Sequence, residues 1–400
     1  MSRRVWAGLA ALVVGGIVTY GARGSFGLFI KPWEEAFGAD RATVSLVSAI
    51  GFVALGLSQP FAGRLLDRVG GKVVLVVGLA TCAIGLAVAA LATDLWQAIL
   101  GAGVIASAGA GFASLSTMSF IAAGLVERRS GIAFGVLTAA AAGGQVIVLP
   151  IATVVLNVSL QASMALLALL VAMAFLIAAI VVPATPPTGA GDRGSVMGDL
   201  ASIAKTRGFW FLLVPFFICG YTSTGLTDTH LIPYATDHHL SEATASAALA
   251  TLAAFNVAGV LLSGWLTDRL DRGKMLAFTY TARAGILLLL PALTSSPALF
   301  VFAAFFGLAD YATVPPTTSL TRTVCVAGGW GFALSLISAA HQAGSALGAW
   351  AGGWFYTQTG SYDLSFSTGA AALLVGAGLS WLVRSGPRSA PRSDQVAVPV

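Results

Sequence analysis

The chain has 400 residues, of which 57% are hydrophobic and only 9% are charged, and its mean hydropathy is +0.88. Soluble domains carry about 25% charged residues, so this composition excludes a soluble globular protein. The net charge of +5 does not indicate a partner nucleic acid, because the cations are sorted by membrane side, as shown below.

Apolar runs long enough to cross a bilayer follow one another along the whole chain. A hydrocarbon core about 30 Å thick needs about 20 apolar residues per helix, and the chain has room for about twelve such helices. We predict spans at 5–30, 43–65, 73–93, 96–124, 131–155, 161–182, 209–236, 243–266, 275–294, 297–321, 331–356 and 363–384.

The Lys and Arg residues indicate the orientation of these spans. If the N-terminus is cytoplasmic, 17 of the 21 lie in cytoplasmic segments, and only Lys31 and Arg41 lie in loops on the other face. Cytoplasmic loops carry an excess of Lys and Arg, so we expect both termini in the cytoplasm.

The longest connection separates six predicted spans from six others. Residues 183–208 begin with a Pro-rich stretch and then become amphipathic, which predicts a cytoplasmic linker with a short surface helix. We therefore expect a six-helix bundle over 1–182, a second over 209–384, and a polar cytoplasmic tail over 385–400.

A charged, glycine-flanked segment occurs twice, each time where one apolar run ends and the next begins. The first copy is marked by Gly63, Asp67 and Arg68, and the second, at an offset of 201 residues, by Gly264, Asp268 and Arg269. We interpret both copies as cytoplasmic gating loops, in which the first aspartate caps a helix or pairs with a cation such as Arg128 or Arg129. A purely topogenic signal that only fixes orientation is the alternative.

Other residues repeat in the same register. At the offset of 201, Tyr20 matches Tyr221 and Pro32 matches Pro233, and at an offset of 200 Gly144 matches Gly344. Matches that include charges and prolines in one register are hard to explain by shared apolar composition. Two parallel six-helix halves with a site between them are a transporter plan in which one half rocks against the other.

With these motifs the chain resembles the major facilitator superfamily, over nearly its whole length. Asp67-Arg68 and Asp268-Arg269 are similar to the superfamily's cytoplasmic loop motif. Three further stretches resemble bacterial monocarboxylate-type and oxalate/formate-type carriers: 23–32 with 37–41 in the first helix, 127–135 with the following Gly143-Gly144 in the fifth, and Arg283 in the eighth.

This resemblance implies an all-α membrane protein with twelve transmembrane helices in two pseudo-symmetric six-helix bundles. It also implies a monomer in a bacterial cytoplasmic (inner) membrane that uses no cofactor, and a role for Arg283 in binding the substrate carboxylate. Animal members carry an aspartate one turn before that arginine, whereas this chain has Thr279, so a charge-paired arginine of that kind is absent.

Ionisable side chains inside the bilayer are costly and are functional hypotheses by default. Arg283, near the middle of its span, has two interpretations. It binds an anion, because its guanidinium fork matches a carboxylate, or it forms a structural ion pair with Asp310 or Asp228. For Arg23 the two interpretations are a second anion contact or gate, and a side chain that extends to the outer interface.

The remaining ionisable groups lie in the second half, which suggests that this half carries the coupling. Asp228, His230 and Asp310 are candidates for a proton-coupling step, because histidine titrates near physiological pH and a buried carboxylate can bind a proton. His341 is a candidate substrate contact. The alternatives are a histidine bonded to a backbone carbonyl and an aspartate that neutralises an arginine.

Tyr20 and Tyr221, in matching places of the two halves, are further candidates for lining a substrate site. Asp228 and His230 are two residues apart, so their side chains diverge by roughly 200° around a helix, and at least one of them faces away from a central cavity.

The chain therefore predicts a secondary active transporter that moves a small, monocarboxylate-like organic anion by alternating access, with a proton as co-substrate or a counter-anion in exchange. The alternative is an exporter of drugs or amphipathic metabolites with the same fold. We expect no enzyme, because no Ser/His/Asp constellation, metal-ligand spacing or nucleotide-binding loop occurs.

Overall fold

The structure is a computed structural model that describes residues 3–125, 130–185, 196–324 and 330–383. Every regular element in these ranges is helical. The first half contains α1 (Arg3–Gly24), η1 (Phe26–Phe29), α2 (Ile30–Phe37), α3 (Arg41–Val69), α4 (Gly71–Ala90), α5 (Leu95–Ala98), the π-helical η2 (Ile99–Ala106), α6 (Ser107–Phe112), α7 (Leu115–Leu125), α8 (Ser130–Leu156) and α9 (Leu160–Val181).

The second half repeats this plan after a short helix in the predicted linker. It contains α10 (Val196–Ala204) in the linker, then α11 (Arg207–Gly220), the π-helical η3 (Tyr221–Thr227), α12 (Asp228–Asp237), α13 (Glu242–Thr267), α14 (Arg272–Leu289), η4 (Leu290–Ala292), α15 (Ser296–Asp310), η5 (Tyr311–Thr313), α16 (Val314–Val324), α17 (Trp330–Thr359) and α18 (Asp363–Trp381).

Eleven of the twelve predicted spans are confirmed, with ends that differ by up to seven residues. In the described part of the chain, eleven helical stretches are long and apolar enough to cross a membrane. The remaining predicted span, 331–356, corresponds to α17, which has 30 residues and carries the polar pair His341-Gln342 near its middle. The tail 385–400 and residues 186–195 of the linker lie outside the described residues, and the exact boundaries of the two halves stay predictions.

The repeat extends to the way in which helices begin. The side chain of Asp40 accepts a hydrogen bond from Thr43 N at 2.8 Å at the start of α3. At the matching place in α13, Ser241 Oγ accepts from Thr244 N at 3.1 Å. Both contacts satisfy a backbone N–H that has no partner inside the helix, so the same local chemistry starts the second helix of each half.

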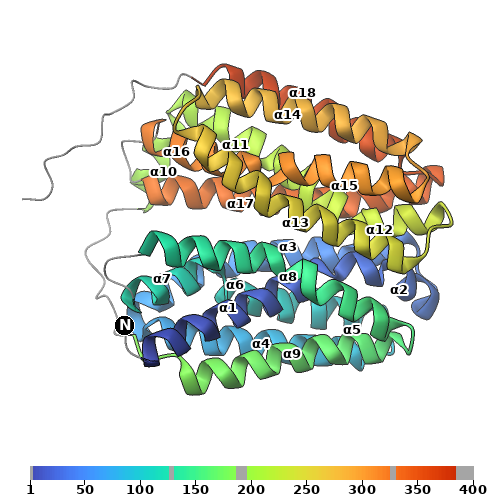
Figure 1. Ribbon diagram of the computed structural model, residues 1–400, viewed down its shortest axis with the longest axis horizontal. Coiled ribbons are helices and arrows are strands. Elements are labelled where there is room, and N and C mark those ends of the chain that lie inside the picture. The colour runs from blue at the N-terminus through green and yellow to red at the C-terminus, as the bar shows by residue number, and fades with distance from the viewer. Residues whose placement is uncertain (1–2, 126–129, 186–195, 325–329, 384–400) are drawn as a thin grey trace, which may run out of the picture.

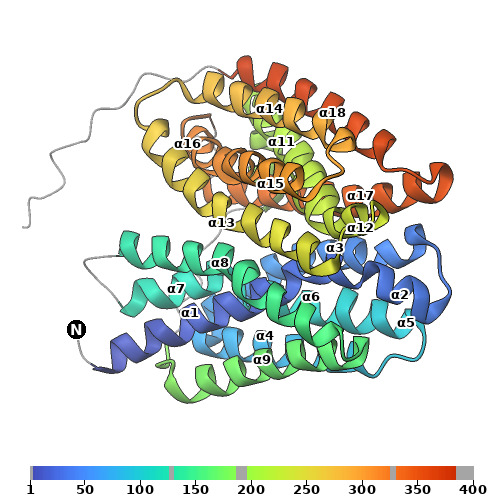
Figure 2. The same ribbon diagram turned by 45° about the vertical axis from the view of Figure 1, so that its right-hand side comes forward.

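The two halves lie side by side as separate bundles, with the first half below and the second above in Figure 1. Between them, α3 packs on α17 and α8 packs on α13, as both views show (Figure 2). Inside the halves the repeat recurs as close backbone packing. A Cβ at Gly144 would clash with the backbone oxygen of Ile17, and a Cβ at Gly344 would clash with that of Phe217.

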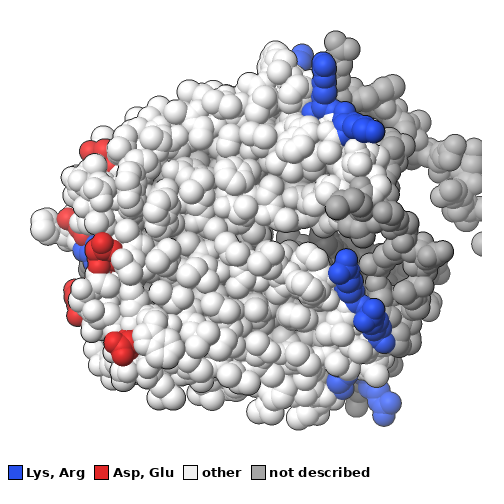
Figure 3. All heavy atoms as spheres, turned by 180° about the vertical axis from the view of Figure 1, so that it is seen from behind, with Lys and Arg blue, Asp and Glu red and all other residues white. Residues whose placement is uncertain are grey.

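Charge separates the two ends of the helices (Figure 3). We call the end with Arg4, Arg64, Lys205 and Lys274 the basic end, and the opposite end, with Glu34, Asp40, Asp94 and Asp237, the acidic end. Lys31 and Arg41 are cations of the acidic end. This distribution of Lys and Arg between the two ends matches the one predicted from the sequence.

The halves are joined toward the acidic end. Along α3, Gly353 of α17 abuts the backbone oxygen of Arg41, and Gly56 abuts the side chain of Gln342. Nearer the basic end, a Cβ at Gly63 or at its counterpart Gly264 would meet no atom within 4 Å, and the surface is hollowed between the halves at that end (Figure 3).

The segments expected as gating loops are largely helical. Gly63, Asp67 and Arg68 belong to the last turns of α3, which continues to Val69. The side chain of Asp67 and the candidate partners Arg128 and Arg129 lie outside the described residues.

In the second copy, Gly264 lies in α13 and Asp268 is its C-cap. Arg269 donates to Trp265 O at 2.9 Å, and its guanidinium lies 4.0 Å from the centre of the Trp265 ring. The gating role of both copies stays a prediction.

Candidate functional site

A central cavity, part of it open to solvent, lies between the two halves. Both halves contribute polar side chains to its wall: Tyr20, Arg23, Ser48, Ser107 and Gln145 from the first, and Thr224, Asp228, Thr229, Asn256 and Tyr311 from the second.

Arg23 lies in the last turn of α1, where the first span is interrupted before η1. Its guanidinium lies over the ring of Phe52, 4.5 Å from the ring centre. The atom Nη2 is buried and has no hydrogen-bond partner. Arg23 therefore brings a positive charge with an unused donor to the cavity.

Asp228 is the first residue of α12, directly after the π-helical segment η3. Its Oδ1 is buried and has no hydrogen-bond partner. A Cβ at Gly27 of the first half would lie 2.6 Å from the backbone oxygen of Asp228, so the halves touch beside this carboxylate. Gly27 comes four residues after Arg23, and the two charged groups thus face one cavity from opposite halves.

These two charges do not form an ion pair with each other, although both line the same space. A buried polar atom without a partner costs free energy. A small molecule with a negatively charged group suits Arg23, and a hydrogen-bond donor or a proton suits Asp228.

Other wall residues are held by the backbone of the first half. Tyr20 Oη accepts from Leu115 N at 3.0 Å. Gln145 Nε2 donates to Gly24 O at 3.0 Å, beside the interruption of the first span. Both contacts satisfy backbone groups at helix ends, so they fix the wall around Arg23.

Arg283 is fully buried inside the second half and is not part of the cavity wall. Its Nη2 lies 3.2 Å from Asp310 Oδ1 and donates to Ser223 Oγ at 2.6 Å. The geometry is that of the structural ion pair with Asp310, which the sequence left as an alternative. A substrate contact by Arg283 stays a prediction.

His341 and Tyr221 also lie beside the cavity and not in its wall. The ring of His341 packs on Phe216, with ring centres 4.9 Å apart. The backbone of Tyr221 packs against two glycines of α17. Among the eight residues predicted for substrate binding or proton coupling, Tyr20, Arg23 and Asp228 are brought together.

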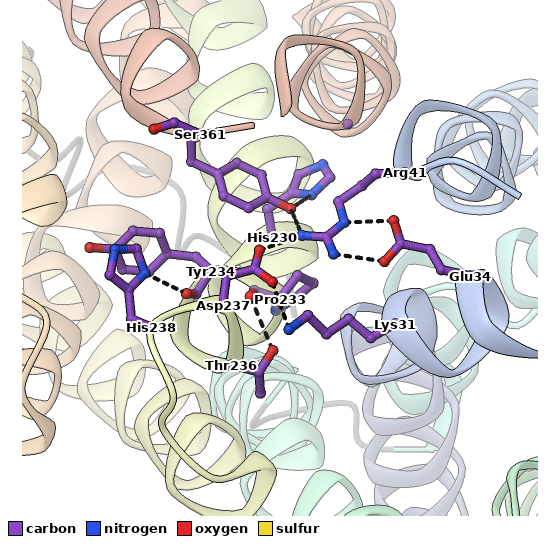
Figure 4. Close-up of polar contacts among 12 residues, drawn as sticks. Lys31, Glu34, Arg41, His230, Pro233, Tyr234, Thr236, Asp237, His238 and Ser361 are labelled. Carbon is purple, nitrogen blue, oxygen red and sulfur yellow. Dashed lines mark hydrogen bonds and ion pairs between the residues drawn. The ribbon is translucent and has the colours of Figure 1, made fainter. Parts of the chain in front are cut away.

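A network of charges joins the two halves at the acidic end (Figure 4). Arg41 of α3 is held within its own half by both carboxylate oxygens of Glu34, at 2.8 and 2.7 Å. It then crosses to the second half, where its Nη1 lies 2.6 Å from Asp237 Oδ2. Lys31 Nζ lies 2.6 Å from the other oxygen of Asp237.

His230 completes this network. Its Nε2 lies 2.7 Å from Ala349 O, and its Nδ1 lies 3.0 Å from Tyr362 Oη. Because a carbonyl only accepts, a neutral ring with its proton on Nε2 satisfies both contacts. Tyr362 then donates to His230 and accepts from Arg41 Nη1 at 3.2 Å.

His230 and Asp228 thus point to different places, as their spacing predicts. His230 is fully buried and bonded to a backbone carbonyl, which is the alternative that the sequence left open. Its proposed part in proton coupling stays a prediction.

Sequence reasoning did not single out Glu34, Arg41, Asp237 and Tyr362 as functional residues. The available signal was that Lys31 and Arg41 are the two cations of the outer loops. Their partner Asp237 lies 196 residues away from Arg41 in the chain, so no local pattern connects them. Burial also raises the pKa of Tyr362 above its ordinary value, which keeps this hydroxyl neutral and able to donate.

The sequence profile described as the Major Facilitator Superfamily matches residues 12–279 and, in a second match, 217–399. The chain belongs to the Major Facilitator Superfamily. It is a transporter of this superfamily and not an enzyme.

Among its relatives is the uncharacterized MFS-type transporter YcxA of Bacillus subtilis, 28% identical over 382 residues that cover 91% of this chain and 90% of YcxA. Monocarboxylate transporter 13 of Rattus norvegicus is 24% identical over 364 residues, which cover 90% of this chain and 85% of that protein.

Among solved structures, the crystal structure of a mutant of the nucleoside transporter NupG superposes with a TM-score of 0.79. It shares 15% sequence identity, and the match covers 93% of this chain and 98% of NupG. A bacterial homolog of the human lysosomal transporter Spinster, inward-facing and unoccupied, gives a TM-score of 0.76 at 14% identity, covering 96% and 97% of the two chains. These likenesses establish the fold.

Proposed function

We propose that this superfamily member is a secondary active transporter of a small, monocarboxylate-like organic anion, which binds between Arg23 and Asp228. The observation that carries the proposal is the pair of buried, unpartnered atoms, Arg23 Nη2 and Asp228 Oδ1, in the walls of one cavity. The likeness to monocarboxylate transporter 13 supports the same substrate class.

Arg23 supplies the anion contact. An arginine stays protonated and offers several donors to a carboxylate. The positive charge of Arg23 compensates the negative charge of the substrate, which lowers the cost of moving the substrate through an apolar protein. Because Arg23 belongs to the first half, a substrate bound to it moves with that half.

Asp228 supplies the coupling step. It is the candidate proton carrier with an unpartnered oxygen in the cavity, whereas His230 and Asp310 are bonded to partners in the protein. Protonation of Asp228 removes a negative charge from the cavity and so favours entry of an anion. Anion exchange without a proton is the other mode, and the experiment below separates the two.

Alternating access requires that the two ends open in turn. The network of Arg41, Asp237 and Tyr362 holds the acidic end closed, and Gly63 and Gly264 face open space nearer the basic end. The positive-inside rule supports a cytoplasmic basic end, and in this proposal the molecule is therefore in an inward-open state. The inner membrane and cytoplasmic termini belong to this proposal.

The test is uptake by proteoliposomes of labelled small carboxylates (formate, acetate, pyruvate, oxalate), with and without an imposed pH gradient. We expect saturable uptake of at least one compound, abolished by Arg23→Gln and retained by Arg4→Gln, a matched change at the exposed basic end. Equal uptake by Arg23→Gln and the unmodified protein would refute the anion contact.

The pH gradient and a preloaded counter-anion distinguish the coupling modes. Stimulation by the gradient supports proton coupling, and stimulation by the counter-anion supports exchange. Absence of all carboxylate uptake, together with drug hypersensitivity of a deletion strain, would favour an exporter of drugs or amphipathic metabolites.

A further inference from the structure

Two membrane spans of the second half are interrupted at the level of the cavity. The seventh changes from α11 to the π-helical η3 and then to α12, and the tenth changes from α15 to the 3₁₀ turn η5 and then to α16. Thr224 and Asp228 line the cavity from the first interruption, and Tyr311 lines it from the second. Single-turn irregularities of this kind often occur at functional sites.

Arg283, from α14, reaches both interruptions at once. Its Nη2 donates to Thr222 Oγ1 at 2.9 Å and to Ser223 Oγ at 2.6 Å in η3. The same nitrogen lies 3.2 Å from Oδ1 of Asp310, the last residue of α15. One guanidinium therefore connects the seventh and tenth spans.

Further contacts close this cluster. The hydroxyl of Ser223 donates to Asp310 Oδ1. Arg283 Nη1 donates to Cys219 Sγ at 3.1 Å, and the guanidinium lies 5.1 Å from the centre of the Phe306 ring. The cluster thus spans α11, η3, α14 and α15, and it is sealed by an aromatic ring.

Both charged groups are shut away from the cavity. Arg283 is 0% exposed and Asp310 is 1% exposed, and neither is part of the cavity wall. The next residues along the chain do belong to it, because Thr224 follows Ser223 and Tyr311 follows Asp310. Any influence of the pair on a bound molecule passes through these neighbours.

We propose that Arg283 and Asp310 are positioning residues, whose ion pair holds the two interruptions in register and so places Thr224, Asp228 and Tyr311 in the cavity wall. The inference rests on the proposed function, in that this wall binds the transported molecule. It differs from the family resemblance, which assigns the carboxylate of the substrate to Arg283.

The charges of the pair compensate each other. Asp310 Oδ2 and Arg283 Nε have no hydrogen-bond partner, so Asp310 depends on the guanidinium and on Ser223. Removal of one member of a buried pair leaves an uncompensated charge, whereas replacement of both by neutral groups of similar shape is often tolerated. A direct substrate contact predicts the opposite pattern, because its loss cannot be repaired at Asp310.

The experiment measures the position of the wall without any substrate. Thr224→Cys introduces a thiol into the cavity wall, and its rate of reaction with methyl methanethiosulfonate, a small neutral reagent, is measured in purified protein. The protein without Thr224→Cys keeps Cys82, Cys219 and Cys325 and gives the background rate, to which the buried Cys82 and Cys219 contribute little. Four variants then combine Thr224→Cys with a further change: Arg283→Gln, Asp310→Asn, these two together, or Arg4→Gln as a matched control.

We expect each single change in the pair to shift the labelling rate by about tenfold or more. The double change Arg283→Gln/Asp310→Asn should return it to within about threefold of the Thr224→Cys parent, and Arg4→Gln should leave it unchanged. A rate that stays unchanged in Arg283→Gln, or that the double change does not restore, overturns the proposal.

Carboxylate uptake is then measured for the same changes without Thr224→Cys. Recovery of uptake in the double change supports positioning, and a double change as inactive as Arg283→Gln alone indicates direct contact and overturns it. If no carboxylate is taken up but the labelling pattern is as expected, the proposed function fails and the positioning role stands.

Where Arg283→Gln does not give a monodisperse protein, Ser223→Ala replaces it, because both charges remain. A labelling rate shifted by about threefold or more then supports the proposal, and an unchanged rate overturns it.

Discussion

Replacement of Asp237 by Asn is expected to open the acidic end. Asp237 accepts from Lys31 and Arg41, each at 2.6 Å, and so connects two cations of the first half to α12 of the second. Asparagine has nearly the same shape but carries no charge and a single acceptor oxygen. The change therefore weakens contacts that exist only while this end is closed.

The size of the effect follows from burial. The side chain of Arg41 is 5% exposed and that of Asp237 is 18% exposed, whereas Lys31 is 28% exposed. A hydrogen bond to a charged group contributes about 1.5–3 kcal/mol, and solvent screening reduces the share of Lys31. A total of about 2–4 kcal/mol shifts the ratio of open to closed molecules by about 30-fold to about 700-fold, at tenfold per 1.4 kcal/mol.

The assay uses Ala49, which lies on α3 about two turns after Arg41. Ala49 packs against Ala346 and Ala349 of α17. In Ala49→Cys, a membrane-impermeant thiol reagent added to intact cells reacts when the acidic end is open. We expect Asp237→Asn to raise the labelling rate by at least tenfold. The matched control is Asp94→Asn, an exposed aspartate of the same end.

Equal labelling rates in Asp237→Asn and Asp94→Asn would refute the view that this network holds the end closed. A raised rate in both would show that net charge at this end, and not the specific pair, controls opening. Measurement of both rates at low and at high salt adds a check, because a partly buried pair is screened less than exposed charges.

Three other changes test separate features. Asp228→Asn should make carboxylate uptake independent of an imposed pH gradient, and uptake that still follows the gradient would exclude Asp228 as the proton carrier. Gly27→Ala should reduce the uptake rate by tenfold or more with normal membrane insertion, because its Cβ would lie 2.6 Å from the Asp228 backbone oxygen. Asp40→Ala should lower stability by about 1 kcal/mol through loss of the cap. Hydrogen bonds from Thr43 lower the pKa of Asp40, so the cap contributes above the ordinary carboxylate pKa and is lost as pH falls through the lowered value. The difference in melting temperature between Asp40→Ala and the unmodified protein should therefore shrink as the pH falls through this lowered value.

The helices and their arrangement could be predicted because the bilayer restricts the length and the composition of every segment that crosses it. Spans must be apolar and long enough to cross, and their ends carry the cap residues and glycines that the chain displays. Asp40 before α3 and Ser241 before α13 are examples. The doubled charged segment then revealed two halves.

The partners of the buried charges could not be predicted in the same way. Arg41 pairs across 196 residues with Asp237 and across 321 residues with Tyr362, and several carboxylates were available to each arginine. Such choices depend on how the two halves pack, which no local pattern encodes.

The interrupted helices add a second reason. One extra residue in a π-helical turn rotates everything after it by about 100°, and η3 precedes Asp228 directly. Helical periodicity read through the seventh span therefore cannot tell whether Asp228 or its neighbours face the cavity. The sequence did indicate that Asp228 and His230 diverge, because both lie in the regular helix after the interruption.

The two halves have the same arrangement of helices but differ in their buried charged residues, and this difference bears on the mechanism. In the first half, α4 carries no charged side chain after Lys72, and the backbone of Cys82 packs so closely on Gly109 that a Cβ there would clash with Cys82 N. In the second half, α14 carries Arg283 instead, with Asp310 as its partner. The first half therefore has a tightly packed apolar interior and presents a cation to the cavity, whereas the second has a buried ion pair and presents a carboxylate. In the proposed alternating-access mechanism the interior of each half is preserved when the halves rock, and the relation between Arg23 and Asp228 across the cavity changes.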